Sequence, residues 1–398
     1  MRSIVFGLCV YVLFVSPMIV SVSSANDGGS TPQWADGSIL HAQLAPARVD
    51  DECDLGQRLW EKGLLVTQDK DDQIYVLDPE AGECWVYSPS GEEISSFSPS
   101  GWEPLRRTPI FTGFATSPSG DQFAAGTGNL ITLFTPKKVQ VHTTVESMIS
   151  SVAFVDRDLV VAQLPFRFDE DGAGAIAWPY LLAWLDQEDA TIEFEALEPD
   201  SARGPDPMVV GLTQSVEITS DPSSDLIWAL DKHKLYRVRR LSSSGSLERT
   251  WTSDRVREPA RFERVSAAAT DDEVPEEEAD EAGQQAIEEN HESDETTTTV
   301  PINAPKIVWD AVARDGFLWV LLKVDGSTAI DVFDRDCQGP ILRLRVDAGN
   351  QPVGNIAVVD DAVWVFPLGI AEGGVPTRYP RDEDWLIRQN VYGGGSER

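Results

Sequence analysis

The chain is poor in positive charge and in histidine, and each shortage excludes a class of function. It carries 32 Lys and Arg against 66 Asp and Glu, for a formal net charge of −34. Nucleic acids and anionic membranes bind proteins through cationic surfaces, so neither is an expected partner. Only four histidines are present, and His41 and His291 lie in polar stretches. The remaining His142 and His233 are too few for a multi-histidine metal centre.

Cysteine is also scarce, and its spacing excludes a zinc site. Beyond Cys9 in the apolar N-terminus, the chain has Cys53, Cys84 and Cys337, with no CxxC pair. In an oxidising compartment three cysteines allow one disulfide and leave one thiol over. Cys84 falls in an expected buried strand, so we predict the pair Cys53–Cys337, and the other two pairings remain open.

The sequence lacks the motifs of nucleophilic catalysis and of phosphate binding. It has no Gly-x-Ser-x-Gly, no cysteine with a matching histidine, and no Gly-rich phosphate loop. Asp69, Asp71 and Glu80 occupy positions one, three and twelve of an EF-hand loop, but Ile74 stands where glycine is required. We interpret that match as coincidence. The acidic residues 169–172 are a weaker calcium candidate. No cofactor is therefore predicted, with calcium as the alternative.

The N-terminal segment, residues 1–25, has the pattern of a signal peptide. Arg2 precedes an apolar stretch at residues 4–22, and the small residues Ser23, Ser24 and Ala25 suit cleavage. An uncleaved membrane anchor is the alternative. Either reading predicts an exported protein, periplasmic or secreted. Residues 26–46 follow as a polar arm, in which residues 39–43 could form one strand.

A repeated pattern after residue 63 predicts the fold. Six times a polar turn precedes an apolar strand rich in β-branched and aromatic residues, at residues 73–77, 122–125, 159–162, 226–230, 317–321 and 362–366. A unit repeated in this way is one blade of a propeller and not a domain of its own. In the clearest repeat, residues 64–67, 73–77, 84–87 and 94–97 form four antiparallel strands, A to D. Residues 307–346 repeat the same order.

Two of the repeats resemble a known family. Residues 66–78 with 85–91, and residues 315–320 with 330–334, are similar to the NHL-type propeller repeat. That repeat has an acidic turn, an aliphatic-aromatic-Val strand, an Asp, and then a short aromatic strand before a Gly turn. The other four repeats match loosely. The family is a scaffold with many functions, so the resemblance implies the fold and not a ligand.

The spacing predicts an all-β chain with six four-stranded blades within residues 47–395, and five or seven blades remain alternatives. Each blade has about 48 residues once an acidic insertion is removed. The sixth repeat lacks a clear fourth strand. We therefore expect an N-terminal strand within residues 39–59 to complete it and close the ring.

The acidic insertion, residues 261–303, is predicted to be disordered. Its part at residues 271–295 holds 13 Asp or Glu, no Lys or Arg, and no hydrophobic period. Such a segment buries too little apolar surface to offset the loss of chain entropy. A solvated spacer is the plain interpretation. A tail that binds cations or a basic partner, or one that covers the basic face of the propeller, are the alternatives.

Long connections gather on one end of the expected propeller. The A–B and C–D turns are short, whereas the B–C and D–A connections carry the insertions, and in an up-and-down blade these share one face. Basic and aromatic side chains fall there, which suits a ligand pocket or an anchor for a protein. These candidates are Trp102, Arg106, Arg107, Phe166, Arg167, Phe168, Trp178, His233 and Lys323.

Two functions follow as hypotheses. The first is an exported, non-enzymatic module that binds an extracytoplasmic protein or a small ligand through this face. The second is a calcium-dependent enzyme, lactonase-like or sugar-hydrolysing, with carboxylates in the central channel. The lack of a catalytic motif favours the first.

Overall fold

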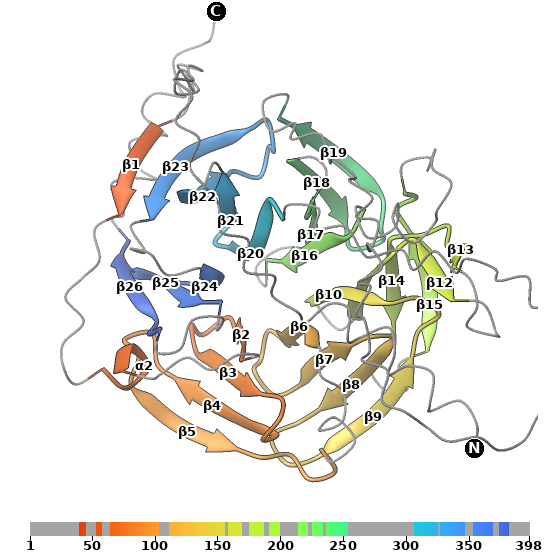
Figure 1. Ribbon diagram of the computed structural model, residues 1–398, viewed down its shortest axis with the longest axis horizontal. Coiled ribbons are helices and arrows are strands. Elements are labelled where there is room, and N and C mark those ends of the chain that lie inside the picture. The colour runs from red at the N-terminus through yellow and green to blue at the C-terminus, as the bar shows by residue number, and fades with distance from the viewer. Residues whose placement is uncertain are drawn as a thin grey trace, which may run out of the picture. The chain divides into compact units, whose positions relative to one another are not determined.

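Six small antiparallel sheets lie around a common axis, and the chain forms them one after another (Figure 1). The predicted six-bladed β-propeller is confirmed, and all six predicted second strands form. The computed structural model describes residues 40–44, 53–57, 64–102, 111–155, 158–168, 175–186, 191–199, 214–221, 225–233, 236–253, 306–324, 327–346, 353–368 and 374–381. The predicted signal peptide, most of the polar arm and the acidic insertion lie outside these residues.

The first three blades are four-stranded antiparallel sheets, and the third also holds an inserted hairpin. Blade one comprises β2 (Leu65–Gln68), β3 (Ile74–Asp78), β4 (Glu83–Tyr87) and β5 (Glu93–Phe97). Blade two comprises β6 (Phe111–Thr116), β7 (Phe123–Thr127), β8 (Leu130–Phe134) and β9 (Val139–Thr144). Blade three comprises β10 (Ile149–Val155), β11 (Asp158–Gln163), β14 (Leu182–Leu185) and β15 (Ile192–Ala196), with the hairpin β12 (Phe166–Phe168) and β13 (Ala175–Ala177) between β11 and β14.

The remaining blades differ in their outer strands. Blade four comprises β16 (Val216–Ser220), β17 (Leu226–Asp231), β18 (Arg237–Ser242) and β19 (Leu247–Thr252). Blade five comprises β20 (Val308–Arg314), β21 (Phe317–Val324), β22 (Ser327–Phe333) and β23 (Pro340–Val346), and β1 (Leu40–Leu44) adds a fifth strand. Blade six shows three strands within the described residues, β24 (Val353–Val359), β25 (Ala362–Pro367) and β26 (Thr377–Pro380).

The hydrophobic core is divided among the seams between blades. Six clusters of buried residues occur, and each joins two neighbouring blades. Large aromatic side chains of the second strands fill them, and Trp228, Trp319 and Trp364 are almost completely buried. Successive side chains of a strand point to opposite faces of the blade, so each strand contributes to the seams on both sides of it. The apolar second strands are therefore buried on both sides, as their sequences indicate.

The innermost strands are linked to one another by polar side chains around the axis. Ser151 Oγ of β10 donates to Glu217 Oε1 of β16 at 2.5 Å. Asp310 Oδ2 of β20 accepts from the backbone N–H of Ile356 in β24 at 2.7 Å. Gln68 of β2 donates to Val358 O at 2.7 Å and accepts from Val358 N at 2.6 Å. The bonds of Asp310 and Gln68 satisfy backbone groups that the inner edges of the sheets leave unpaired.

The expected closing strand forms, but it completes a different blade. Strand β1 pairs in parallel with β23, the outer strand of blade five, with Leu40 opposite Leu342 and Leu44 opposite Val346. The prediction that it would supply the fourth strand of blade six is therefore wrong. The edge of β23 is seven residues long, whereas β26 has four residues and ends at Pro380, which has no N–H to donate.

The first and sixth blades are instead joined by a short helical segment and by core packing. Helix α2 (Asp54–Gln57) follows Cys53, and Leu55 N donates to Gly91 O at 2.9 Å. Cys53 and Leu55 are buried with Trp364 of blade six in the seam between blades six and one. Among the described residues no helix is long and apolar enough to cross a bilayer.

The predicted disulfide Cys53–Cys337 is contradicted by the structure. Cys53, Cys84 and Cys337 are all free and buried. Each lies in a different seam: Cys53 between blades six and one, Cys84 between one and two, and Cys337 between four and five. Cysteines in separate core clusters cannot meet without unfolding a blade. Burial raises the pKa of the Cys337 thiol to about 11, so it stays protonated.

Candidate functional site

The end of the propeller that carries the B–C loops and D–A links, here called the loop face, holds an inserted hairpin. Strands β12 and β13 form a two-stranded sheet inside the B–C connection of blade three. The side chain of Ile176 on this hairpin is 46% exposed. An exposed apolar side chain on an added loop element suits contact with another molecule.

Two of the predicted residues meet at the base of this hairpin. The Arg167 guanidinium lies 5.1 Å from the ring centre of Trp178 and forms an ion pair with Glu146 at 2.8 Å. Trp178 Nε1 donates to Glu195 Oε1 at 3.1 Å. Because the Arg167 side chain is still 40% exposed, its fixed guanidinium is available to a partner. We call Arg167, Ile176 and Trp178 the hairpin cluster.

Two other predicted residues belong to the core. Trp102 is buried between blades one and two, where its Nε1 donates to Pro79 O at 3.0 Å and its ring meets Phe134 edge to face. Phe166 is 1% exposed. These aromatic side chains hold the loops in place and offer no surface to a ligand.

The remaining predicted residues are scattered. Arg106 and Arg107 lie outside the described residues, as does the side chain of Phe168. His233 follows β17 and is half-buried. Lys323 is exposed near the end of β21, with its Nζ 5.9 Å from the ring centre of Trp309. The structure therefore brings Arg167 and Trp178 together, and it places Lys323 beside Trp309, which was not among the predicted residues.

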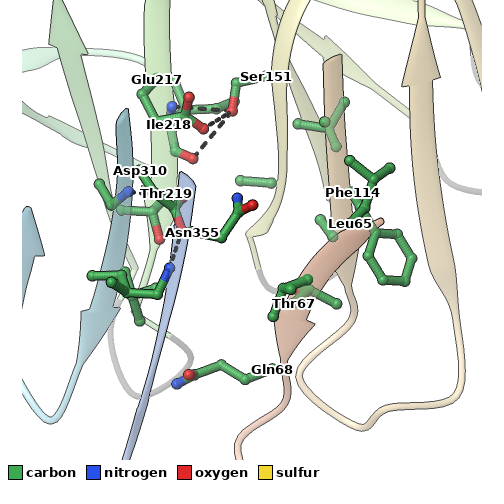
Figure 2. Close-up of a pocket in the computed structure, with 18 of the residues that line it drawn as sticks. Leu65, Thr67, Gln68, Phe114, Ser151, Glu217, Ile218, Thr219, Asp310 and Asn355 are labelled. Carbon is green, nitrogen blue, oxygen red and sulfur yellow. Dashed lines mark hydrogen bonds between the residues drawn. The ribbon is translucent and has the colours of Figure 1, made fainter. Parts of the chain in front are cut away.

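A cavity of about 260 Å³ lies on the axis and is lined by the innermost strands of all six blades. Figure 2 shows Glu217 and Ser151 at one end of it and Gln68 at the other. Glu217 lies near the start of β16, as Trp309 and Asp310 lie near the start of β20, so this end opens toward the loop face. We call Glu217, Lys232, Lys306, Trp309 and Asp310 the mouth cluster.

One pair in the mouth cluster is satisfied internally. Lys232 Nζ forms an ion pair with Glu217 Oε2 at 2.6 Å and donates to Ser150 O at 2.6 Å. Both side chains are largely buried. Both residues belong to blade four, and their hydrogen bonds to Ser150 and Ser151 link the pair to blade three. The two opposite charges largely cancel and leave little charge for a ligand.

Lys306 and Asp310 are held less completely. Lys306 Nζ donates to Trp309 O at 3.2 Å and lies 4.9 Å from the centre of the Trp309 ring. Burial, together with the Lys232 ammonium, lowers the pKa of Lys306 to about 8. Asp310 Oδ1 accepts from Ala311 N at 2.9 Å, while Oδ2 accepts from Ile356 N. Burial and the Glu217 carboxylate raise the pKa of Asp310 to about 7.

A sequence signal for the mouth cluster existed. Glu217 and Asp310 are acidic residues near the start of the first strand of their blades, each next to apolar residues. In a propeller that strand lines the axis, so a charge there faces the channel. The second hypothesis predicts carboxylates in the central channel, but neither Glu217 nor Asp310 is among the residues named for it.

The described residues offer little for calcium. No group of three or more His, Cys, Asp or Glu side chains is placed there to hold a metal ion, and residues 169–172 lie outside the described part. Asp69 uses both carboxylate oxygens in its own turn, where it accepts from Asp71 N, Gln73 N and the Tyr75 hydroxyl. The EF-hand match is thus a turn motif.

These features define the class of protein: a β-propeller, a fold that serves generally as a scaffold for binding. No family model and no curated protein matches the chain. Among solved structures it is similar to Raptor from Chaetomium thermophilum, with 10% identity and a TM-score of 0.44. The match covers 81% of this chain and 25% of that one, so the chain spans a quarter of the Raptor length. A similarity this weak says nothing about partner or activity.

Proposed function

We propose that the chain is an exported, non-enzymatic binding module that holds a protein partner on its loop face. The observation that supports this most is the β12–β13 hairpin, an addition to the four strands of blade three that buries Phe166 and exposes Ile176. It presents the hairpin cluster, an arginine, a tryptophan and an exposed isoleucine. Arginine and tryptophan are among the residues that contribute most to protein interfaces.

The geometry of Arg167 favours binding, because its side chain would lose little further conformational entropy when a partner binds. Glu146 and Trp178 already restrict the guanidinium from two sides. A side chain that is already ordered loses less conformational entropy on association than a mobile one. The excess of acidic residues elsewhere favours a partner that brings basic as well as apolar groups.

Export and the NHL-type resemblance are part of the proposal. The pattern of residues 1–25 supports a location outside the cytoplasm, and the charge of −34 disfavours nucleic acid and anionic membranes as partners. Free buried cysteines are compatible with either redox compartment, since none is placed to form a bridge within the described residues.

The hairpin cluster can be tested by substitution. We expect Arg167→Ala with Trp178→Ala to weaken binding of a partner, first captured from extracytoplasmic extract and then purified, by at least about 30-fold, which is about 2 kcal/mol. Titration calorimetry measures this. The matched control is Lys137→Ala with Ile94→Ala, which removes a lysine and an exposed isoleucine away from the hairpin. Equal affinity of the two double variants would exclude the hairpin as the interface.

A calcium-dependent enzyme is the second candidate, and the carboxylates of Glu217 and Asp310 at the channel favour it. Under the binding-module proposal, we expect the melting temperature to be the same in millimolar calcium and in a chelator. A specific site would raise it, because a ligand that binds only the folded state stabilises that state by mass action. A calcium-dependent rise that Asp310→Asn abolishes would favour the enzyme.

A further inference from the structure

Three lysines gather at the channel mouth of a strongly acidic chain. Ile307 N donates to Lys232 O at 2.7 Å, and Lys323 N donates to Ile307 O at 3.1 Å. These backbone bonds set Lys232 and Lys323 on either side of Ile307, next to Lys306. Only Lys232 has a carboxylate in contact, whereas Lys306 and Lys323 form no ion pair with any described residue.

Both of these lysines lie over the same aromatic ring. Their ammonium groups are 4.9 Å (Lys306) and 5.9 Å (Lys323) from the centre of Trp309. An aromatic ring stabilises a cation without neutralising it. The channel mouth therefore carries positive charge that no contacting carboxylate of the described residues neutralises, although the chain is rich in acidic residues.

The cavity that Lys306 lines offers a second hydrogen-bond donor, and its wall is more polar than apolar. Asn355 of β24 lines the cavity and is half-buried, and its amide forms no hydrogen bond with the described residues (Figure 2). Further along, the lining includes Leu65 and Phe114 from β2 and β6.

We propose that the channel mouth binds a small organic carboxylate, with its carboxylate on Lys306 and the Asn355 amide and its hydrocarbon part inside the channel. This site is separate from the hairpin cluster and does not depend on the partner proposed above. An ammonium donates a charge-assisted hydrogen bond to a carboxylate, and an amide N–H adds a neutral one. The apolar atoms that share the lining, among them those of Leu65, gain from contact with the hydrocarbon.

Local charge outweighs the overall charge of the chain at this site. At physiological ionic strength, charges more than about 8 Å away are largely screened when solvent-exposed. The groups that face Lys306 are Glu217, Lys232 and Asp310. Glu217 is paired with Lys232, and the raised pKa of Asp310 leaves part of it neutral near pH 7. The ligand therefore meets a cationic Lys306.

The test is titration calorimetry of the full chain with hexanoate, and with hexanamide as an uncharged isostere. We expect saturable binding of hexanoate at one site, at least tenfold tighter than hexanamide. The Lys306→Met variant should bind hexanoate at least tenfold more weakly, and Asn355→Ala several-fold more weakly. Lys137→Met, at an exposed turn outside the cavity, should bind as the unaltered chain does. Affinity should fall from pH 7 to pH 9 as Lys306 loses its proton.

Three results would overturn the proposal. They are no saturable binding at millimolar hexanoate, equal affinity for hexanoate and hexanamide, and unchanged affinity of Lys306→Met. If Lys306→Met does not fold, as judged by its melting temperature, Asn355→Ala and the pH dependence of the unaltered chain decide the matter. The hairpin variant Arg167→Ala with Trp178→Ala should bind hexanoate normally, which separates failure of this site from failure of the protein interface.

Discussion

Replacing Asp331 by alanine is expected to lower the free energy of unfolding by about 3–5 kcal/mol, because it leaves a buried charge without its partner. Asp331 is 0% exposed in the middle of blade five. Arg343 donates to it twice, from Nε to Oδ1 at 2.5 Å and from Nη2 to Oδ2 at 2.6 Å. The Tyr236 hydroxyl of blade four donates to Oδ2 at 3.0 Å. All three side chains are buried.

This network links two blades as well as two strands. Burial, with the Asp331 carboxylate adding to it, raises the pKa of Tyr236, so its hydroxyl remains a donor at neutral pH. Removal of the carboxylate leaves both the Arg343 guanidinium and that hydroxyl without this partner in a region from which water is excluded. The cost of an unsatisfied buried group then adds to the loss of the ion pair.

Urea denaturation followed by circular dichroism measures the effect. Asp336→Ala, in the exposed turn that follows β22, is the matched control and should stay within about 0.5 kcal/mol. The double variant Asp331→Leu with Arg343→Met should recover much of the loss, since two apolar side chains can replace a buried pair. If Asp331→Ala is as stable as Asp336→Ala, the pair contributes nothing and this account of blade five is wrong.

Trp364→Ala is the second change with a large expected effect, about 3–5 kcal/mol, since it opens a cavity in the seam between the last blade and the first. Trp364 is completely buried, and its Nε1 donates to Pro89 O of blade one at 3.1 Å. The contact is close: at Gly91, whose φ is +90°, an added Cβ would lie 2.8 Å from the Trp364 ring. Within the described residues no strand pairs across this seam, so the seam is held by side-chain packing together with the hydrogen bonds between Gln68 and the Val358 backbone.

Loss of Trp364 should therefore increase local opening mainly in blades one and six, which meet at this seam. Hydrogen exchange is expected to accelerate most in β2 and β24, the inner strands on either side of this seam, and least in β10 and β16 across the channel. Trp178→Ala is the control for loss of an indole, and it should cost less than about 1 kcal/mol because Trp178 lies on the hairpin and not in a seam. Uniform acceleration in all blades would mean that the seam does not open separately.

The fold was predictable because its signal is local and repeated. Each second strand is a short run of β-branched and aromatic residues after a polar turn, and such runs pack on both faces wherever they occur. The turns carry their own chemistry: Asp72 and Asp315 both adopt positive φ, of 63° and 55°, at A–B turns. Asp is one of the few residues other than glycine that tolerates this conformation.

The candidate site was predictable only in part. The loop face was chosen from the lengths of connections, and it does carry the hairpin with Arg167 and Trp178. Trp102 and Phe166 were chosen by the same rule, yet they are core residues. Loop position in the sequence does not distinguish an aromatic side chain that faces solvent from one that seals a seam, because that depends on the neighbouring blade.

What the sequence by itself determined is the repeated blade: strand lengths, turn positions and the apolar second strands are set by interactions between near neighbours in the chain. Only the tertiary structure decided the partners across blades. It paired β1 with the long edge of blade five, separated the three cysteines into three seams, and bonded the backbone of Ile307 to both Lys232 and Lys323. These contacts join residues far apart in sequence, and they follow from which edges and seams remain open once the blades have formed.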